Sequence, residues 1–202
     1  MNFLCISCYF KGGAFLEALK AEGHTVFLLT KQDLQHEPWP KESIDEFFFM
    51  GSDANSPENF KSIALGLAWL MRQRKIDRIV ALDDFDVEKA AYLREEFRIP
   101  GMGQTTVRYF RDKLAMRIRA AEAGIRVPAF TSLFNDAQIN HFASTTPTPW
   151  ILKPRSEASA TGMRKIHSHA ELWHIINELG DDRHKYLLEQ FKPGQVFHVD
   201  AI

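Results

Sequence analysis

A lysine followed by a run of small residues is the segment best suited to chemistry. Lys153 ends an apolar stretch, and residues 154–162 read Pro-Arg-Ser-Glu-Ala-Ser-Ala-Thr-Gly. Small side chains let backbone N–H groups approach an anion closely, and the lysine adds a positive charge beside the same phosphate. The segment therefore suits phosphate binding. A plain hairpin connection is the alternative, although hairpin loops usually contain about 2–5 residues.

Other familiar phosphate-binding patterns are missing from the sequence. No segment fits the P-loop G-x-x-x-x-G-K-[ST], and nothing before the first predicted helix fits G-x-G-x-x-G. Lys113 is a second candidate cation, but it falls in the middle of a predicted long helix, off the apolar stripe. A lysine in that position usually faces solvent.

Acidic residues follow the strand predicted near residue 80. Asp83, Asp84 and Asp86 lack the glycine and the distal glutamate of an EF-hand. A helix cap is the simpler interpretation, although ligands also bind at strand carboxyl ends in open α/β sheets. Residues 11–13, Lys-Gly-Gly, follow the first predicted strand in the same way. They either turn the chain or meet an acidic group on a substrate.

The sulfur and imidazole groups do not form a recognisable metal motif. Cys5 and Cys8 are the only cysteines, and no partner pair follows at a zinc-finger spacing. They lie in an apolar run, so we expect buried thiols rather than a redox or metal site. His167 and His169 alternate at a predicted strand end, and this spacing alone is weak support for a metal. No metal ligand is therefore predicted.

Composition and charge exclude several classes of protein. The 202 residues include 25 Lys and Arg against 26 Asp and Glu, a formal charge of −1, so no basic field favours nucleic acid. The start lacks a basic n-region, and nowhere do about 18 apolar residues run together. We expect a soluble, cytoplasmic protein with no nucleic-acid or membrane partner.

Strand-like and helix-like segments alternate over the first hundred residues. Strands are predicted over residues 3–8, 25–29, 45–50 and 78–82. Helices are predicted over residues 14–22, from the Ser-Pro-Glu at 56–58 to residue 71, and from Asp86 to residue 97. This alternation predicts a doubly wound parallel sheet.

The Pro- and Gly-rich residues 99–103 mark the expected domain boundary, giving domains 1–103 and 104–202. One long helix is predicted to begin at Thr105 or Thr106 and to end at Gly124, with an apolar face of Val107, Phe110, Leu114, Ile118 and Ala121. Strands over 130–134, 150–153, 163–167 and 186–191, a helix over 168–179 and a surface loop over 140–149 complete an α+β second half.

Three segments, in this order, carry a family resemblance. Residues 83–128 contain DDFD, IPGMGQTT, FRDKLAMR and AGIRVP; residues 150–156 read WILKPRS and are followed by GMRK at 162–165; residues 188–200 read LEQFKPGQVFHVD. They resemble the linker, the first strand pair with its phosphate loop, and the adenine hinge of ATP-grasp carboxylate–amine ligases. The resemblance is close over residues 75–202 and only architectural before them. It implies a Rossmann-like pre-ATP-grasp domain followed by the first portion of an ATP-grasp domain.

The resemblance also implies a set of nucleotide-binding residues. Lys113 would reach the α-phosphate and Lys153 the α- and β-phosphates. The loop with Ser156, Ser159 and Gly162 would close over them. The strand of Glu189, Gln190 and Phe191 would bind the adenine edge through its backbone, with the Glu189 side chain near the exocyclic amine. Val196 stands where the family often has a ribose-binding acid, and His198 and Asp200 are the substitutes on the same strand face.

For function, the resemblance implies a ligase that uses ATP and Mg²⁺ to phosphorylate a carboxylate. An amine, often that of an amino acid, then attacks the acyl-phosphate. A carboxylase or carbamoyl-phosphate-type enzyme that phosphorylates bicarbonate is the alternative within the family, and a nucleotide-binding module without catalysis is another. The expected partners are the small carboxylate and amine substrates, and a homodimer is in keeping with many relatives.

Family members continue into a further lobe that supplies the metal-binding carboxylates and a phosphate-binding arginine. We therefore expect the 202 residues to be the front part of a ligase, an excised or truncated chain. No catalytic residue is assigned, and this stretch alone is expected to be inactive.

Overall fold

The computed structural model describes residues 1–51, 59–157, 162–195 and 197. It divides into two compact units, Met1–Arg111 and Asp112–Ile202. The sequence indicated a boundary between residues 103 and 104. The helix over residues 104–111 packs on the helix before it, residues 87–96, and so belongs to the first unit.

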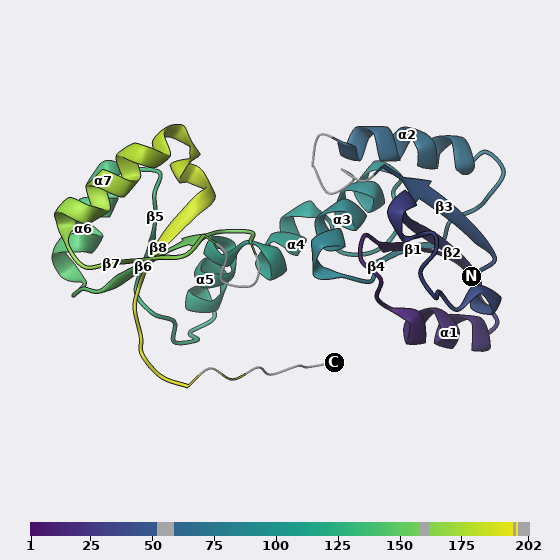
Figure 1. Ribbon diagram of the computed structural model, residues 1–202, viewed down its shortest axis with the longest axis horizontal. Helices are drawn as coiled ribbons and strands as arrows, with labels where there is room; N and C mark the ends of the chain where they lie inside the picture. The colour runs from purple at the N-terminus through teal and green to yellow at the C-terminus, as the bar shows by residue number, and fades with distance from the viewer. Residues whose placement is uncertain (52–58, 158–161, 196, 198–202) are drawn as a thin grey trace. The chain divides into compact units, whose positions relative to one another are not determined.

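A parallel four-stranded sheet forms the centre of the first unit (Figure 1). Its strand order is β3-β2-β1-β4, with β1 (Asn2–Ser7), β2 (Thr25–Lys31), β3 (Glu46–Met50) and β4 (Arg78–Ala81). The helices are α1 (Gly13–Ala21), α2 (Phe60–Leu70), α3 (Val87–Glu96) and α4 (Gln104–Arg111). Short 3₁₀ turns occupy Gln32–Leu34, Lys41–Ser43 and Asp84–Asp86. The predicted parallel sheet is confirmed, while the predicted helix start at 56–58 lies outside the described residues.

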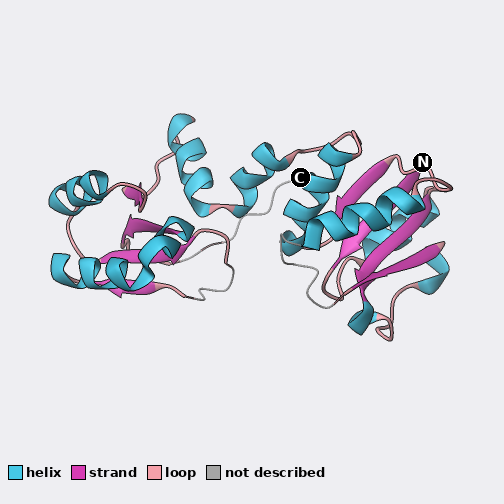
Figure 2. Ribbon diagram, turned by 90° about the horizontal axis from the view of Figure 1, so that it is seen from above, coloured by secondary structure: helices cyan, strands magenta, loops and turns pink. Residues whose placement is uncertain are grey.

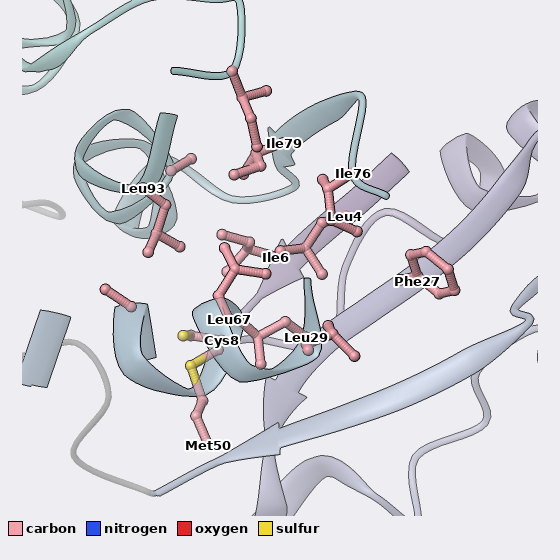
Figure 3. Packing of buried hydrophobic residues seen from close by; sticks show 14 residues of the cluster. Leu4, Ile6, Cys8, Phe27, Leu29, Met50, Leu67, Ile76, Ile79 and Leu93 are labelled. Atoms are coloured by element: carbon pink, nitrogen blue, oxygen red, sulfur yellow. The ribbon is translucent and has the colours of Figure 1, made fainter. Parts of the chain in front are cut away.

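Helices cover both faces of this sheet, as the near-continuous apolar strands predict. Leu16 and Leu19 of α1 pack against Phe3, Cys5 and Leu28 on one face. On the other face α2 and α3 bury the cluster drawn in Figure 3, in which Leu67 and Leu93 meet Leu4, Ile6, Cys8 and Leu29. Both cysteines are buried and unpaired with each other, so the predicted buried thiols are confirmed.

The carboxyl ends of β1 and β4 meet at one edge of the sheet. Gly12 precedes α1 with φ 86°, and a Cβ there would lie 2.7 Å from Leu82 Cδ1, so residues 11–13 form a tight turn that needs glycine. Lys11 Nζ lies 2.5 Å from Asp83 Oδ2. Asp83 also accepts a hydrogen bond from the Phe85 N–H, which makes it the cap of the 3₁₀ turn.

A buried ion pair lies beneath this edge. Asp86 occupies the cap position of α3, as predicted, but its side chain makes no capping hydrogen bond. Instead one carboxylate oxygen accepts from the Cys8 N–H at 2.8 Å, and the other lies 3.0 Å from Lys89 Nζ. Lys89 Nζ also lies 2.7 Å from Cys8 Sγ. Asp86 therefore joins the end of β1 to the start of α3.

The second unit is built on an antiparallel sheet, and strands are drawn in magenta in Figure 2. The strand order is β5-β8-β6-β7. Its elements are α5 (Lys113–Glu122), β5 (Phe130–Ser132), α6 (Asp136–Thr145), β6 (Trp150–Pro154), β7 (Arg164–Ile166), α7 (His169–Leu179), a 3₁₀ turn Gly180–Lys185, and β8 (Tyr186–Gln190). The predicted α+β second half is confirmed.

Two local predictions in this region are wrong. Residues 140–149 were expected to be a surface loop, but Asn140 to Thr145 belong to α6, which buries Ile139 and Phe142. The Asn135 side chain accepts from the Gln138 N–H and caps this helix. The cap and the apolar pair i, i+3 were the available signals, and the Ser/Thr-rich composition concealed them.

The single long helix predicted from residue 105 to residue 124 is also wrong, because it breaks at Asp112. That residue is extended, with φ −96° and ψ 110°, and its carboxylate caps α5 by accepting from the Leu114 N–H. The predicted apolar face is not continuous, since Phe110 is 61% exposed while Leu114 is buried. Lys113 is therefore the first residue of α5 and not a residue in the middle of a helix.

Candidate nucleotide-binding site

One face of the second sheet gathers charged side chains. Ile151 and Lys153 point away from Trp150 and Leu152, because side chains alternate along β6. Ile151 is paired with Lys165 on β7 and with Glu189 on β8, so these two share its face. The opposite face is apolar and is covered by α6 and α7. Lys153 and Glu189 thus stand on the face that those two helices leave uncovered.

Glu189 and Lys153 form an ion pair on this face. Lys153 Nζ lies 2.6 Å from Glu189 Oε2, and Arg117 Nε of α5 lies 3.0 Å from Glu189 Oε1. The Glu189 side chain is only 2% exposed, whereas Lys153 keeps 22% of its side-chain surface and Arg117 keeps 23%. A buried carboxylate is thus compensated by two cations that still reach the surface. The expected role of Glu189 at an exocyclic amine is not tested by this arrangement.

Lys113 lies at the entrance to the predicted phosphate loop. As the first residue of α5 it donates its N–H to the Arg155 carbonyl at 2.9 Å, and its Nζ contacts the Glu157 carbonyl oxygen. Lys153 lies near the end of β6, the strand that leads into the same loop. The two lysines that the sequence indicated therefore flank one segment, although they are 40 residues apart in the chain.

Arg155 fixes the start of that loop. Its Nε lies 2.9 Å from Asp112 Oδ1, its second terminal nitrogen contacts Asp112 Oδ2, and its first donates to the His184 carbonyl at 2.9 Å. Burial alone would raise the pKa of Asp112, but the hydrogen bonds and charge of Arg155 hold that pKa below its usual value. In turn, Asp112 raises the pKa of Arg155.

The remaining loop residues are only partly described. Ser156 follows Arg155 at one end, and Gly162 stands at the other with φ 71° and a Cβ position 3.0 Å from Pro154 Cγ. Ser159 lies outside the described residues, as do the proposed ribose-binding substitutes His198 and Asp200. A glycine is needed at 162 because its backbone is left-handed and closely packed.

The hinge strand is held by neighbouring segments. The Gln190 N–H donates to the Ala129 carbonyl at 2.8 Å, and the Phe191 N–H donates to the Pro149 carbonyl at 3.0 Å. Lys165 Nζ lies 4.2 Å from the centre of the Phe191 ring. These two N–H groups are therefore already used in hydrogen bonds within the protein.

Sequence reasoning did not single out Arg117, Asp112 or Arg155 as parts of this site. An arginine on a helix usually extends into solvent, and nothing local shows that Arg117 reaches β8. For Asp112 a signal was present, since aspartate is a preferred helix cap and precedes Lys113 directly.

No group of three or more His, Cys, Asp or Glu side chains able to hold a metal ion occurs in the part of the chain that the structure describes. No helix among the described residues is long and apolar enough to span a membrane.

Solved structures identify the fold. The chain matches an L-amino acid ligase from Bacillus licheniformis with a TM-score of 0.68 and 16% identity, over 94% of this chain and 44% of that one. It matches N5-carboxyaminoimidazole synthetase from Staphylococcus aureus, in complex with ADP, with a TM-score of 0.65 and 19% identity, over 94% and 47%. This is the fold of ATP-grasp ligases.

The ATP-grasp fold also includes carboxylases. The biotin carboxylase domain dimer of Hydrogenobacter thermophilus 2-oxoglutarate carboxylase, solved with MgADP, ADP and bicarbonate, matches with a TM-score of 0.70 and 19% identity, over 94% of this chain and 44% of that one. The chain thus spans less than half the length of these ATP-grasp structures. No family model matches it, and no curated protein matches it in sequence.

Proposed function

We propose that this chain is the nucleotide-binding part of an ATP-dependent ligase that activates a carboxylate as an acyl-phosphate and joins it to an amine. The observation that carries the proposal is the pair of lysines around one loop. Lys113 contacts the start of the loop from α5, and Lys153 precedes the loop on β6, on the sheet face opposite to α6 and α7. Two cations around a loop of small residues suit a triphosphate.

Positioning and charge neutralisation provide most of the chemistry in phosphoryl transfer. In the proposed complex, Lys113 contacts the α-phosphate, Lys153 contacts the α- and β-phosphates, and backbone N–H groups between Ser156 and Gly162 face the phosphates. Ser159 belongs to this loop. Glu189, Gln190 and Phe191 hold the adenine, and His198 and Asp200 serve the ribose. Mg²⁺ would enter with the nucleotide and offset its negative charge.

A bicarbonate-using carboxylase is the second candidate. It is favoured by the similarity to the domain solved with bicarbonate and to carboxyaminoimidazole synthetase. Both candidates place the same demands on the nucleotide site, so they differ in the acceptor that takes the phosphoryl group. A small carboxylate with an amine is the partner set of the first, and bicarbonate is that of the second.

Calorimetric titration of Mg·ATP into the chain tests the nucleotide site. We expect heat of binding with the wild type and a loss of affinity of at least about tenfold with Lys153→Met, which removes one charge-assisted contact of roughly 1.5–3 kcal/mol. Lys41→Met is the matched control, because Lys41 is exposed and lies in the first unit. A folded wild type that takes up no Mg·ATP, or equal binding by Lys153→Met, would contradict the proposal.

A further inference from the structure

Arg117 contacts Glu189 of the proposed nucleotide site but has no role assigned in it. Its Nε lies 3.0 Å from Glu189 Oε1, while the other oxygen of the same carboxylate lies 2.6 Å from Lys153 Nζ. The three side chains carry two positive charges and one negative charge. Because Glu189 is 2% exposed, its negative charge has little water to stabilise it and depends on these partners.

We propose that Arg117 is a positioning residue that keeps Glu189 neutralised when Lys153 turns to a nucleotide phosphate. The inference rests on the proposed function and names a residue for the same site. Lys153 is shared between two anions, the buried carboxylate and the incoming phosphate. With Arg117 in place, Lys153 moves to the phosphate without leaving Glu189 as an uncompensated buried charge.

The location of Arg117 on α5 suits this role. Arg117 follows Lys113 by four residues, one helical turn, so the two side chains extend from the same side of the helix. The start of α5 is in turn joined to the phosphate loop, through Asp112 with Arg155 and through the Lys113 N–H. One helix thus presents a cation to the loop and a second cation to the carboxylate beneath Lys153.

Arginine also fits the geometry better than lysine does. Its guanidinium keeps its charge at all relevant pH values and retains donors beyond the one used on Glu189. Its 23% exposed side chain remains partly hydrated, which reduces the cost of holding two cations near one another. The excess positive charge that remains, one unit across the three side chains, favours an anion at this face.

Four variants and one control variant test the inference by calorimetric titration with Mg·ADP. We expect Arg117→Met to weaken binding about tenfold, because Lys153 then remains on Glu189. Adding Glu189→Gln to Arg117→Met removes the charge that needs compensation, and we expect affinity to return to within about threefold of Glu189→Gln alone. Arg117→Lys should retain most of the affinity. Arg119→Met is the matched control, since Arg119 lies on the same helix and is 61% exposed.

Three results would overturn the inference: unchanged affinity in Arg117→Met, no recovery when Glu189→Gln is added, or no rescue by Arg117→Lys. A purely structural role for Arg117 predicts that the double variant is at least as weak as Arg117→Met.

Failure of the proposed function is a separate result. If the folded wild type takes up no Mg·ADP, the proposed function is contradicted. Urea unfolding of the same variants still tests whether Arg117 compensates the charge of Glu189. We expect Arg117→Met to lower the urea midpoint clearly when Glu189 is present and much less when Glu189→Gln is already present. Equal, additive losses in the two backgrounds would overturn the inference without reference to any ligand.

Discussion

Arg155 and Asp112 form a two-pronged ion pair that joins the end of β6 to the start of α5. They are 43 residues apart in the chain, and each also fixes a second feature. Asp112 caps α5, and the backbone carbonyl of Arg155 accepts a hydrogen bond from the Lys113 N–H. The ion pair and this hydrogen bond therefore hold the start of α5, with Lys113, against the start of the loop that follows Lys153.

Replacing Arg155 with methionine should destabilise the second unit. The change leaves the Asp112 carboxylate buried without its cation, and hydrogen bonds to charged groups contribute about 1.5–3 kcal/mol each. We expect the free energy of unfolding to fall by about 2–3 kcal/mol, measured by urea unfolding with far-UV circular dichroism. Arg155→Lys should lose less, since it keeps the charge. An Arg155→Met midpoint equal to that of the wild type would show that the pair contributes nothing.

Acid stability should depend on Asp112. Burial raises its pKa in the folded chain, but Arg155 and the backbone N–H groups of Leu114 and Ala115 together hold the pKa below its usual value. A lowered folded pKa means that the stabilisation is complete above the unfolded pKa, about 3.9, and is lost as the pH falls from there through the folded pKa. Asp112→Asn should therefore lower stability at pH 7 and lessen the loss of stability as the pH falls below about 4.

Urea midpoints measured from pH 7 to pH 2.5 test this dependence, with the exposed Asp33→Asn as control. In Asp112→Asn the urea midpoint should fall less steeply with decreasing pH, but it should still fall, because the pKa values of Asp45 and Asp83 are also lowered. Parallel pH profiles for the wild type and Asp112→Asn would contradict the assignment.

Gly12 and Gly23 form a matched pair for the turn after β1. Both have a left-handed backbone, with φ 86° and 76°, but a Cβ on Gly12 would meet Leu82 at 2.7 Å while one on Gly23 would meet nothing within 4 Å. Gly23→Ala should cost about 1 kcal/mol for the backbone alone, and Gly12→Ala about 1–3 kcal/mol more for overpacking. Equal losses of unfolding free energy in the two variants would mean that Leu82 moves aside at little cost.

The two thiols should be inert in the folded chain. Burial raises the pKa of both Cys5 and Cys8 to about 12, and for Cys8 the neighbouring Asp86 adds to the effect. At pH 8 only about one thiol in ten thousand is then ionised, and the thiolate is the reactive form. We expect no reaction with Ellman's reagent until urea unfolds the first unit. Reaction of one thiol of the native chain within minutes, seen as release of one equivalent of thionitrobenzoate, would contradict this.

Where the sequence predicted the fold correctly, local pattern and tertiary packing agree. Residues 26–29 are apolar and buried on both faces of the parallel sheet, whereas burial alternates from Trp150 to Pro154, with Trp150 and Leu152 in the core under α6 and α7. The break at Asp112 was missed, although aspartate is a preferred helix cap, because the residues around it are compatible with a helix. The cation that contacts this cap belongs to Arg155, 43 residues away in the chain.

The sequence likewise indicated some residues of the candidate site and missed others. Lys113 and Lys153 could be named from motifs, and the structure brings both to one loop. The contact of Arg117 with Glu189 joins residues 72 apart, through a helix that the sequence could not orient against β8. Long polar side chains reach several strands, so only the packed fold decides which carboxylate such an arginine meets.

The buried pair of Asp86 and Lys89 restricts which substitutions the first unit can accept. An isolated charge-removing change at Lys89 leaves the Asp86 carboxylate in the core without its cation, and one at Asp86 leaves the Lys89 ammonium without its carboxylate. Exchange of both for apolar residues removes the charges but deprives the Cys8 N–H of its acceptor. Viable variants at these positions are thus expected to change together and to keep an oxygen at 86, as Asp86→Asn with Lys89→Met does.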